Sequence, residues 1–519
     1  MFWKPRVVAG RPPTRSRHQL VVLRNGQPCK QRTYHVVSRM GDNHDLGVFN
    51  NNVSAVERAM VERYFLCKVG EEYQPALQTT RGAWDTEVLR AFRRECVSYV
   101  SARATTVSER EVVNMYRGAK RRIYENALRS LYRTPINRKD ASLRPFTKFE
   151  KQSLSKAPRI INPRSPRYNL KLGQYLKLAE KLYYKAINRI WGEHTEHTVI
   201  KGLDPFESAR VMKSKWDRFA DPIALGLDAT KFDMHVSVWA LAFEHSIYDG
   251  TFNSAALREL LSWQLYNSGT AYCPDGQVKF KMPGTRSSGD LNTSLGNCLL
   301  MCALIHEMCT NLGIDAELAN NGDDCVLMFE RSELQRVLEC VPGFFAEKGF
   351  RMTVEEPVDV FEQLEFCQSR PVQLAGGWCM VRNVRTCLKK DPMCLVPIQN
   401  TKVWRKWLAA VGQCGLATVP GCPVLQSFYG AFERSGSRTT KRFNEHVFRN
   451  TSMVERATVG KPNHVTDDAR ASFYRAFGIT PDYQIALEHY FDRVEIGDLN
   501  EDLRVGVVEN MPPAFLRHL

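Results

Sequence analysis

Aspartates occur where a predicted strand ends. In the segment 223–233, IALGLDATKFD, apolar residues alternate as far as Leu227, so Asp228 lies at the end of a half-buried strand. Asp233 follows after a short turn. A carboxylate at a strand end is held rigidly, as a metal ligand must be. Asp228 is therefore a candidate metal ligand, and Asp233 could lie above the same site.

A second acidic pair lies at the tip of a predicted hairpin. Strand-like apolar segments flank Asn321-Gly322, a dipeptide typical of hairpin turns, and Asp323 and Asp324 follow directly. Two adjacent ionised carboxylates repel each other, and a divalent cation shared with a third acid would relieve that repulsion. Ligand sets made only of oxygen favour hard ions such as Mg²⁺ or Mn²⁺. A solvated turn is the alternative for an isolated Asp-Asp pair.

A third group of polar residues lies at the start of a predicted helix. Ser288, Thr293 and Asn297 supply hydroxyl and amide groups, and the last two are one helical turn apart. The helix is expected because apolar residues then recur with helical spacing along one face. Short polar side chains at a helix start are usually caps, and we expect that role for Asp290 or Asn292.

A basic stretch with a single acid, Glu150, precedes these segments. Its positive residues are Arg144, Lys148, Lys151, Lys156, Arg159, Arg164, Arg167 and Lys171. Prolines at 158, 163 and 166 prevent a continuous helix, so the stretch is extended or looped. Such a loop could contact phosphates, and Lys148, Lys151 and Arg164 are candidates for RNA contacts. Ordinary solvent-exposed charge is the alternative.

Together these segments fit phosphoryl transfer from a nucleoside triphosphate. That reaction depends mainly on positioning and on neutralising developing charge. Two metal ions about 3.5–4 Å apart can hold the attacking 3′-oxygen and the leaving pyrophosphate. Asp228, Asp323 and Asp324 are the predicted catalytic ligands of two Mg²⁺ or Mn²⁺ ions. Basic side chains could hold the triphosphate, and hydroxyl or amide groups could test for the ribose 2′-hydroxyl.

The composition limits the class of protein. The 519 residues include 72 Lys and Arg against 56 Asp and Glu, a net charge of +16. A chain of this length is too long to fold around a single hydrophobic core, so about two to four subdomains are expected. The charge favours polyanionic partners, nucleic acid first and an anionic membrane surface second. No apolar run reaches about 18 residues, so no membrane span is expected. The 15 cysteines include no C-x-x-C pair, which indicates a reducing compartment.

With these motifs in this order, the sequence resembles the RNA-dependent RNA polymerases of positive-strand RNA viruses, most of all those of tombusviruses and carmovirus-like viruses. The matching motifs run from Lys148 to about Pro371. The resemblance implies that Lys156 and Arg159 bind the incoming triphosphate. It also implies that Asp323 is the stronger metal ligand of the acidic pair.

Further residues take roles from the same resemblance. Those expected to bind the sugar of the nucleotide are Asp233, Ser288, Thr293 and Asn297. Gly289 is similar to the glycine of a flexible loop that contacts RNA. The segment 364–369, LEFCQS, resembles the primer-grip hairpin, so Cys367 and Ser369 are also expected to contact RNA. Some polymerases protonate the leaving pyrophosphate with a lysine after Gly-Asp-Asp; here Lys348 and Arg351 both remain open.

The resemblance implies an α+β right-hand fold of fingers, palm and thumb, with an antiparallel palm sheet backed by helices and a mostly helical thumb. The expected parts are a basic N-terminal arm and fingertips (1–100), fingers (101–220), palm (221–255), a fingers insertion (256–285), palm (286–390), and thumb with C-terminal tail (391–519). The N-terminal segment would reach from the fingers towards the thumb.

The implied function is template-directed RNA synthesis that replicates a positive-strand RNA virus genome. The expected partners are RNA template and product, nucleoside triphosphates and a membrane-anchored viral replication protein. The expected place is the host cytoplasm, peripheral to membrane-bound replication sites. A reverse transcriptase or DNA polymerase with the same metal site is one alternative, although the sugar-binding residues Asp233 and Asn297 argue against it. A basic RNA-binding or packaging protein is another, and it gives no reason for the acids to converge.

Overall fold

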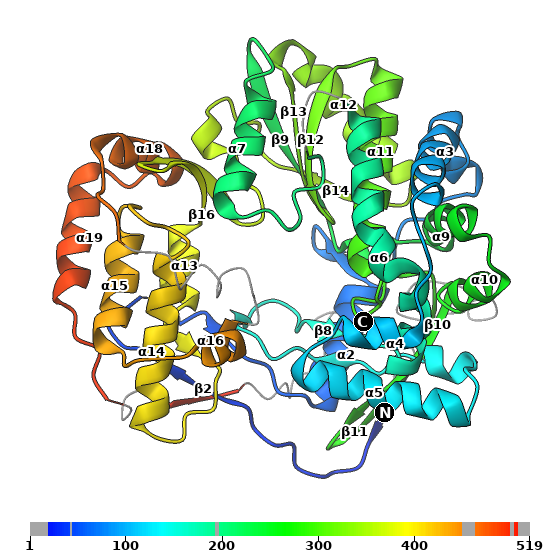
Figure 1. The fold of residues 1–519 in the computed structure, drawn as a ribbon, viewed down its shortest axis with the longest axis horizontal. Coiled ribbons are helices and arrows are strands. Elements are labelled where there is room, and N and C mark those ends of the chain that lie inside the picture. The colour runs from blue at the N-terminus through cyan, green and yellow to red at the C-terminus, as the bar shows by residue number, and fades with distance from the viewer. Residues whose placement is uncertain (1–18, 42–43, 193–196, 449–461, 499–502, 507–519) are drawn as a thin grey trace.

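The computed structural model describes residues 19–41, 44–192, 197–448, 462–498 and 503–506. Helices and antiparallel strands alternate along this chain without a βαβ repeat, so the α+β class is confirmed. Figure 1 shows two lobes that are joined at one edge by a sheet and at the opposite edge by the N-terminal part of the described chain. The start of the predicted basic arm, residues 1–18, lies outside the described residues.

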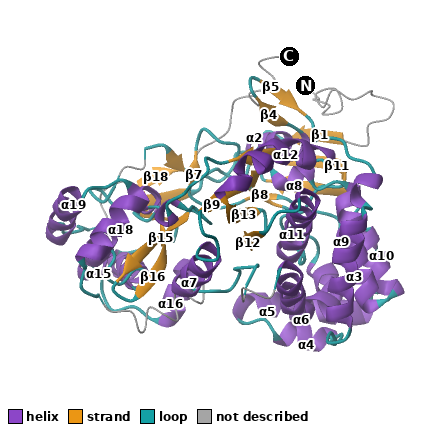
Figure 2. Ribbon diagram, turned by 90° about the horizontal axis from the view of Figure 1, so that it is seen from above, coloured by secondary structure: helices purple, strands orange, loops and turns teal. Residues whose placement is uncertain are grey.

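The central sheet carries the predicted acidic residues. Its antiparallel strands have the order β12-β13-β9-β14, with bounds β12 (Ala316–Asn321), β13 (Asp324–Glu330), β9 (Pro222–Ala229) and β14 (Met352–Val354). Leu225 packs in the core that includes α11 (Thr293–Leu312), whereas its neighbour Ala224 packs in the core that includes α7 (Pro205–Trp216). Figure 2 shows the strands between these two helices. Burial on both faces accounts for the nearly continuous apolar sequence of β9 and β13.

One lobe combines helices with a three-stranded sheet. Its helices are α2 (Val53–Met60), α3 (Glu87–Ser101), α4 (Glu109–Asn114), α5 (Gly118–Arg133), α6 (Pro166–Trp191), α9 (Val238–Phe252) and α10 (Ala255–Ser262). Its strands are β1 (Gln19–Arg24), β11 (Gly276–Pro283) and β10 (Tyr266–Cys273) in one sheet, and β4 (Cys67–Val69) with β5 (Glu72–Gln74) in a small hairpin. Pro166 is the first residue of α6, where a proline loses no helical hydrogen bond, and the hydroxyl of Ser165 accepts from the backbone N–H of Arg167. The last proline of the basic stretch therefore starts this helix.

The other lobe is mostly helical. Its elements are β15 (Ser369–Leu374), β16 (Gly377–Arg382), α13 (Val384–Lys390), α14 (Thr401–Leu416), α15 (Leu425–Ser435), α16 (Lys441–Phe448), α18 (Asp467–Phe477) and α19 (Pro481–Arg493). Buried residues such as Trp407, Phe428 and Phe473 form a hydrophobic core of its own. Separate cores are what the length of the chain predicted.

The N-terminal segment links the two lobes. After β1 pairs with β11, β2 (Thr33–Val36) pairs with both β17 (Met393–Cys394) and β18 (Leu503–Val505). Figure 1 shows this deep-blue segment crossing from one lobe to the other. The chain then returns, and β3 (Leu46–Gly47) pairs with β7 (Gln152–Ser153). The expected reach of this segment across the molecule is confirmed.

Helix α11 has the length and apolar composition that a membrane span needs. Its mean hydropathy is 1.2 over the most apolar window of its 20 residues, and 78% of that window is buried inside the fold. It packs beside the central sheet and α12 (Leu334–Glu347), as a core helix does.

Candidate active site

The predicted acids of β9 and β13 lie on one face of the central sheet. Asp228 is the antiparallel partner of Asp324, and directly paired positions project to the same side. Asp323 lies in the turn between β12 and β13 and is exposed, as is Asp228. The hairpin prediction is confirmed with its turn one residue later, because Asn321 pairs with Asp324 and Gly322, with φ +84°, occupies the turn. Only glycine adopts such a backbone without strain.

Asp233 lies on the short helix α8 (Phe232–His235), directly after β9. The pKa of its carboxyl is raised to about 7, mainly by burial and in part by Asp323, with Arg286 and Arg159 opposing the rise. An acid from the hairpin and an acid from α8 therefore share one electrostatic neighbourhood. This agrees with the prediction that Asp233 lies above the same site.

The other acids also influence one another. Burial raises the pKa of Asp228, Asp323 raises it further, and Lys156 lowers it. The pKa of Asp324 is raised to about 6, mainly by burial, with the Cys367 backbone N–H opposing the rise and Asp323 and Asp228 contributing to it. Carboxylates that raise each other's pKa in this way are stabilised as anions by a nearby cation.

The donor chemistry of this face fits a hard divalent cation, because its ligands are carboxylate oxygens only. In the chain as described, however, no three His, Cys, Asp or Glu side chains already form a metal-binding group. Asp228 and Asp323 are exposed and able to turn, whereas Asp324 Oδ2 accepts from the backbone N–H of Cys367 at 3.0 Å. The acids are thus neighbours without yet forming a ligand set.

The hairpin predicted from 364–369 lies against the acidic turn. Cys367 and Gln368 both have left-handed backbones, with φ +52° and +58°, and this tight turn presents the Cys367 N–H to Asp324. The Asn321 side-chain amide donates to Cys367 Sγ at 3.1 Å. Ser369 starts β15, and its backbone pairs with that of Phe366. The structure brings Cys367 to the acids, while its contact with RNA, like that of Ser369, stays a prediction.

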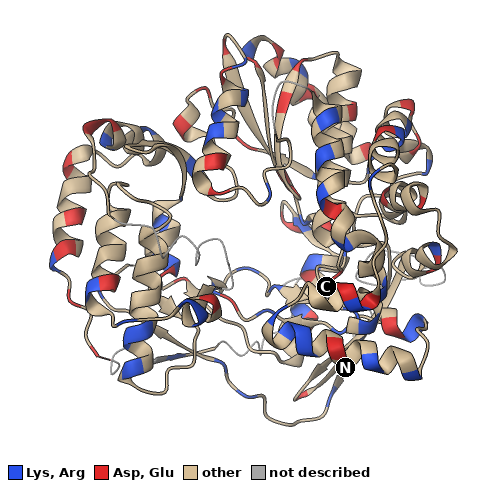
Figure 3. Ribbon diagram, in the orientation of Figure 1, with Lys and Arg blue, Asp and Glu red and all other residues tan. Residues whose placement is uncertain are grey.

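The basic stretch is looped as far as Ser165, as its prolines predicted, whereas its last residues, Arg167 and Lys171, lie in α6. It forms a hairpin of β6 (Phe146–Thr147) and β8 (Ile160–Ile161), with Lys156 and Arg159 exposed between them. Lys156 lowers the pKa of Asp228, and Arg159 lowers that of Asp233, so both cations lie near the acids. Figure 3 shows that Lys and Arg are otherwise spread over both lobes among Asp and Glu, so the positive charge is not confined to this stretch.

Two other cations of the basic stretch, Lys148 and Lys151, form contacts within the protein. The Lys148 ammonium pairs with Glu150 at 2.6 Å, and the Lys151 ammonium donates to the Lys390 carbonyl at 2.6 Å. These contacts hold the loop in place. They leave the predicted RNA contacts of both lysines untested.

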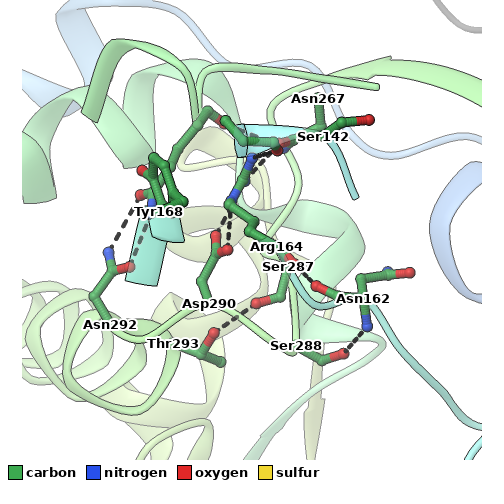
Figure 4. Close-up of polar contacts among 12 residues, drawn as sticks. Ser142, Asn162, Arg164, Tyr168, Asn267, Ser287, Ser288, Asp290, Asn292 and Thr293 are labelled. Atoms are coloured by element: carbon green, nitrogen blue, oxygen red, sulfur yellow. Dashed lines mark hydrogen bonds and ion pairs between the residues drawn. The ribbon is translucent and has the colours of Figure 1, made fainter. Parts of the chain in front are cut away.

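The predicted RNA contact of Arg164 is wrong. Its side chain is 1% exposed, and its guanidinium donates to both carboxylate oxygens of Asp290, at 2.5 and 3.1 Å. It also donates to Asn267 Oδ1 and to the Ala141 carbonyl. Figure 4 shows this cluster between the basic loop and the segment before α11. Arg164 joins two segments of the fold and does not reach solvent.

The predicted caps of α11 are wrong for the same reason. The side chain of Asp290 is held by Arg164, and the side-chain amide of Asn292 donates to Glu244 Oε1 at 2.9 Å. Asn292 does occupy the capping position, but its side chain makes no capping hydrogen bond. Tertiary partners here replace the local hydrogen bonds that the sequence favours.

Two hydroxyls of the third group hold the loop before α11. Ser288 Oγ donates to the Ile160 carbonyl at 3.2 Å and accepts from the Asn162 backbone N–H at 3.3 Å. Thr293 Oγ1 donates to the Ser287 carbonyl at 2.5 Å. Figure 4 shows the contacts with Asn162 and Ser287. Gly289 lies against the basic loop, where an added Cβ would be 2.6 Å from the Asn162 carbonyl oxygen and from backbone atoms of Pro163. Close packing therefore requires glycine at this position.

Asn297 lies at the acidic turn. Asn297 is buried, and a Cβ added to Gly322 would lie 3.7 Å from the Cβ of Asn297. Its side-chain oxygen accepts from Arg286 Nε at 2.8 Å, and Arg286 in turn pairs with Glu244. Sequence reasoning missed both of these charged residues. A lone acid in the apolar segment 238–248 was the available signal for Glu244, since buried acids need a partner.

Of the two residues left open as a general acid, Lys348 is excluded by its position. It is 2% exposed, and its ammonium pairs with Glu307 at 2.7 Å and donates to the Ala83 carbonyl. Arg351 donates to the Pro75 carbonyl at 3.1 Å. The general acid therefore stays unassigned.

Comparison with known proteins agrees with this site. A family model described as viral RNA dependent RNA polymerase matches residues 20–497. The chain is 41% identical over 494 residues to the RNA-directed RNA polymerase of Tobacco necrosis virus (strain A), covering 92% of this chain and 67% of that protein. It is 41% identical to the enzyme of the same name from Cymbidium ringspot virus and 40% identical to that of Turnip crinkle virus, covering 58% and 60% of those proteins. The chain thus spans about three fifths to two thirds of the length of these curated relatives.

Proposed function

The chain belongs to the viral RNA-dependent RNA polymerase family, and from that premise we propose that it copies an RNA template into RNA to replicate a positive-strand RNA virus genome. The observation that carries the proposal is the pairing of Asp228 with Asp324 next to the Asp323 turn. Homologues named as RNA-directed RNA polymerases support it.

The three carboxylates are the proposed ligands of two Mg²⁺ or Mn²⁺ ions, which when bound supply charge neutralisation at the attacking and leaving oxygens. Asp228 and Asp323 need only turn their exposed side chains, and Asp324 is oriented by the Cys367 N–H. The donor set and the mutual repulsion of the acids support this assignment.

The nucleotide would lie between the acids and the basic loop. We assign the triphosphate to Lys156 and Arg159, since both are exposed and both act electrostatically on the acids. We assign the ribose to Asp233 and Asn297. Ser288 and Thr293 support the sugar site through the loop that they hold.

We assign the subdomains on the basis of the same proposed polymerase function. The central sheet would belong to the palm, in 221–255 and 286–390, and the β10–β11 hairpin to a fingers insertion, 256–285. The fingers would be 101–220, with fingertips and arm in 1–100, and the thumb 391–519. The separate core of the mostly helical lobe supports a distinct thumb; that core also includes residues of β15, β16 and α13, which precede 391.

RNA would lie over the exposed acids, within reach of Lys148, Lys151, Cys367 and Ser369, with Gly289 shaping the loop below it. We further propose that the protein works in the host cytoplasm at membrane-bound replication sites, recruited by a membrane-anchored viral replication protein. The net charge of +16 supports polyanionic partners. Flotation with vesicles in the presence and absence of that partner would test recruitment; equal flotation in both would contradict it.

The activity is tested by replacing Asp323 with Asn. The substitution keeps the shape of the turn but removes a charge, so incorporation of ribonucleotides on a homopolymer RNA template with Mg²⁺ or Mn²⁺ should fall to background. RNA binding, measured by fluorescence anisotropy, should persist. The matched control is Asp315→Asn, which changes an exposed aspartate just before the same hairpin begins, at the end far from the acidic turn.

Retained synthesis by Asp323→Asn would contradict the site assignment. Wild-type protein that binds RNA but incorporates no nucleotide would favour an RNA-binding or packaging protein. Preferential use of deoxynucleotides would favour a reverse transcriptase.

A further inference from the structure

Arg286 is a buried cation that joins the two proposed sugar-binding residues. It is 1% exposed. Its backbone N–H donates to the Asp233 carbonyl at 2.8 Å, and its Nε donates to Asn297 Oδ1 at 2.8 Å. Its Nη2 pairs with Glu244 Oε2 at 2.5 Å. One side chain thus reaches from the segment after the turn at Gly284 to α9 and α11.

The chemistry of arginine decides which way Asn297 faces. A guanidinium has five N–H donors and no acceptor, so only the oxygen of the Asn297 amide can meet Arg286 Nε. The NH₂ group of Asn297 must then point away from Arg286. Any substrate that meets this amide therefore meets a hydrogen-bond donor.

Glu244 holds the guanidinium in this position. It is fully buried and also accepts from the Tyr248 hydroxyl at 2.8 Å and from the Asn292 amide at 2.9 Å. Burial alone would raise the pKa of Glu244, but Arg286, His245 and the Tyr248 hydroxyl together outweigh that effect and lower it, so the carboxylate is ionised. The rotation of Arg286 is restricted because Glu244 is itself held by Tyr248, one turn further along α9, and by Asn292, just before α11.

Helix α11 leaves room for the ion pair of Arg286 with Glu244. An added Cβ on Gly296 would lie 2.4 Å from Glu244 Oε1 and 2.5 Å from Arg286 Nη2, so any side chain there would push the pair apart. Arg286 Nη1, in contrast, is buried and has no hydrogen-bond partner among the described residues. An ion pair that served stability alone would be expected to satisfy all its buried donors.

We propose that Arg286 is a positioning residue for sugar selection, which holds Asn297 as a hydrogen-bond donor to the ribose 2′-hydroxyl oxygen while the Asp233 carboxylate accepts a hydrogen bond from that hydroxyl. The inference rests on the proposed function, because it names how the same site distinguishes ribose from deoxyribose. A 2′-hydroxyl satisfies both groups at once. A deoxyribose leaves both unpaired, and unpaired buried polar groups are costly.

The test compares kcat/KM for UTP and dUTP on a poly(A) template in wild-type protein and Arg286→Lys. Lysine keeps the charge, but it cannot pair with Glu244 and Asn297 in the same planar arrangement. The UTP-to-dUTP ratio should fall about tenfold, the equivalent of one hydrogen bond, through a loss of UTP use. The matched control is Arg331→Lys, an ion-paired arginine at the other end of β13, which should leave the ratio unchanged.

A purely structural role would lower the use of UTP and dUTP equally, and an unchanged ratio in Arg286→Lys would overturn the proposal. If Arg286 acts through Asn297, Arg286→Lys combined with Asn297→Ala should have the ratio of Asn297→Ala alone. Additive losses would also overturn it. Wild-type protein without RNA-templated incorporation would refute the proposed function, which is a different outcome.

Asn297→Asp tests the same geometry with Arg286 intact, should Arg286→Lys not fold. A carboxylate still accepts from Arg286 Nε, but it offers the sugar an acceptor in place of the donor. The ratio should therefore fall while the unfolding temperature stays close to that of the wild type. An unchanged ratio in Asn297→Asp would refute the orientation that we infer.

Discussion

Replacing Gly289 with alanine would push the basic loop away from the segment before α11. The new Cβ would lie 2.6 Å from the Asn162 carbonyl oxygen and from the Cα and N of Pro163, all of them backbone atoms, whereas ordinary contact begins at 3.4 Å. The two segments must then separate by about 0.8 Å, the difference between these distances. The isolated bridge between Pro163 and Gly289 lies at the point of separation.

The expected effect of Gly289→Ala follows from that displacement. Forcing an extra methyl group into a packed position costs about 1–3 kcal/mol of unfolding free energy. Because the displaced loop carries Lys156 and Arg159, nucleotide positioning should also suffer. A displacement of about 1 Å costs up to about 100-fold in rate. We therefore expect the single-nucleotide incorporation rate to fall by about 10- to 100-fold.

The assay pairs single-nucleotide incorporation with chemical denaturation. The matched control is Gly343→Ala, within α12, where an added Cβ meets no atom within 4 Å. That variant should keep the wild-type rate and gain up to about 1 kcal/mol from helix propensity. Wild-type rate and stability in Gly289→Ala would refute the argument that close packing requires glycine here.

Two further substitutions probe buried charge. Arg164→Gln should lower the free energy of unfolding by about 3–5 kcal/mol, because Asp290 is left buried and unpaired. The RNA affinity of the folded protein should not change. Weaker RNA binding at unchanged stability would show that Arg164 contacts RNA. Burial lowers the pKa of His245 from 6.5 to about 4, so the unfolded chain binds more protons between these values, and stability falls as pH drops from 6.5 to 4. His245→Gln should remove up to about 3 kcal/mol of this acid-induced loss of stability. The measurement is the drop in unfolding temperature between pH 7.5 and pH 5, which should be smaller in the variant. An equal drop in both proteins would contradict the lowered pKa of His245.

Local sequence patterns were sufficient to predict those features of the fold that depend on a single short segment. Alternation placed Asp228 at the end of β9, and Asn321-Gly322 predicted the hairpin that carries Asp323 and Asp324. Prolines predicted the looped basic stretch. These features depend on backbone preferences and on side-chain periodicity over a few residues, which are properties of the segment itself.

The partners of polar side chains could not be predicted in this way. Arg164 had the same local signal as Lys156, yet one is buried against Asp290 and the other is exposed near Asp228. Asp290 and Asn292 were expected to cap α11, but the partners of their side chains, Arg164 and Glu244, come from other parts of the chain.

The sequence by itself determined which residues could do the chemistry and that the chain folds as helices and strands around several cores. Only the tertiary structure decided that Asp228 faces Asp324, that Cys367 orients Asp324, and that Arg286 orients Asn297. The physical reason is that the first two contacts join segments far apart along the chain, and the third depends on Glu244, on a different helix, which pairs with Arg286. Their geometry depends on how strands pair and helices pack, and no local preference encodes it.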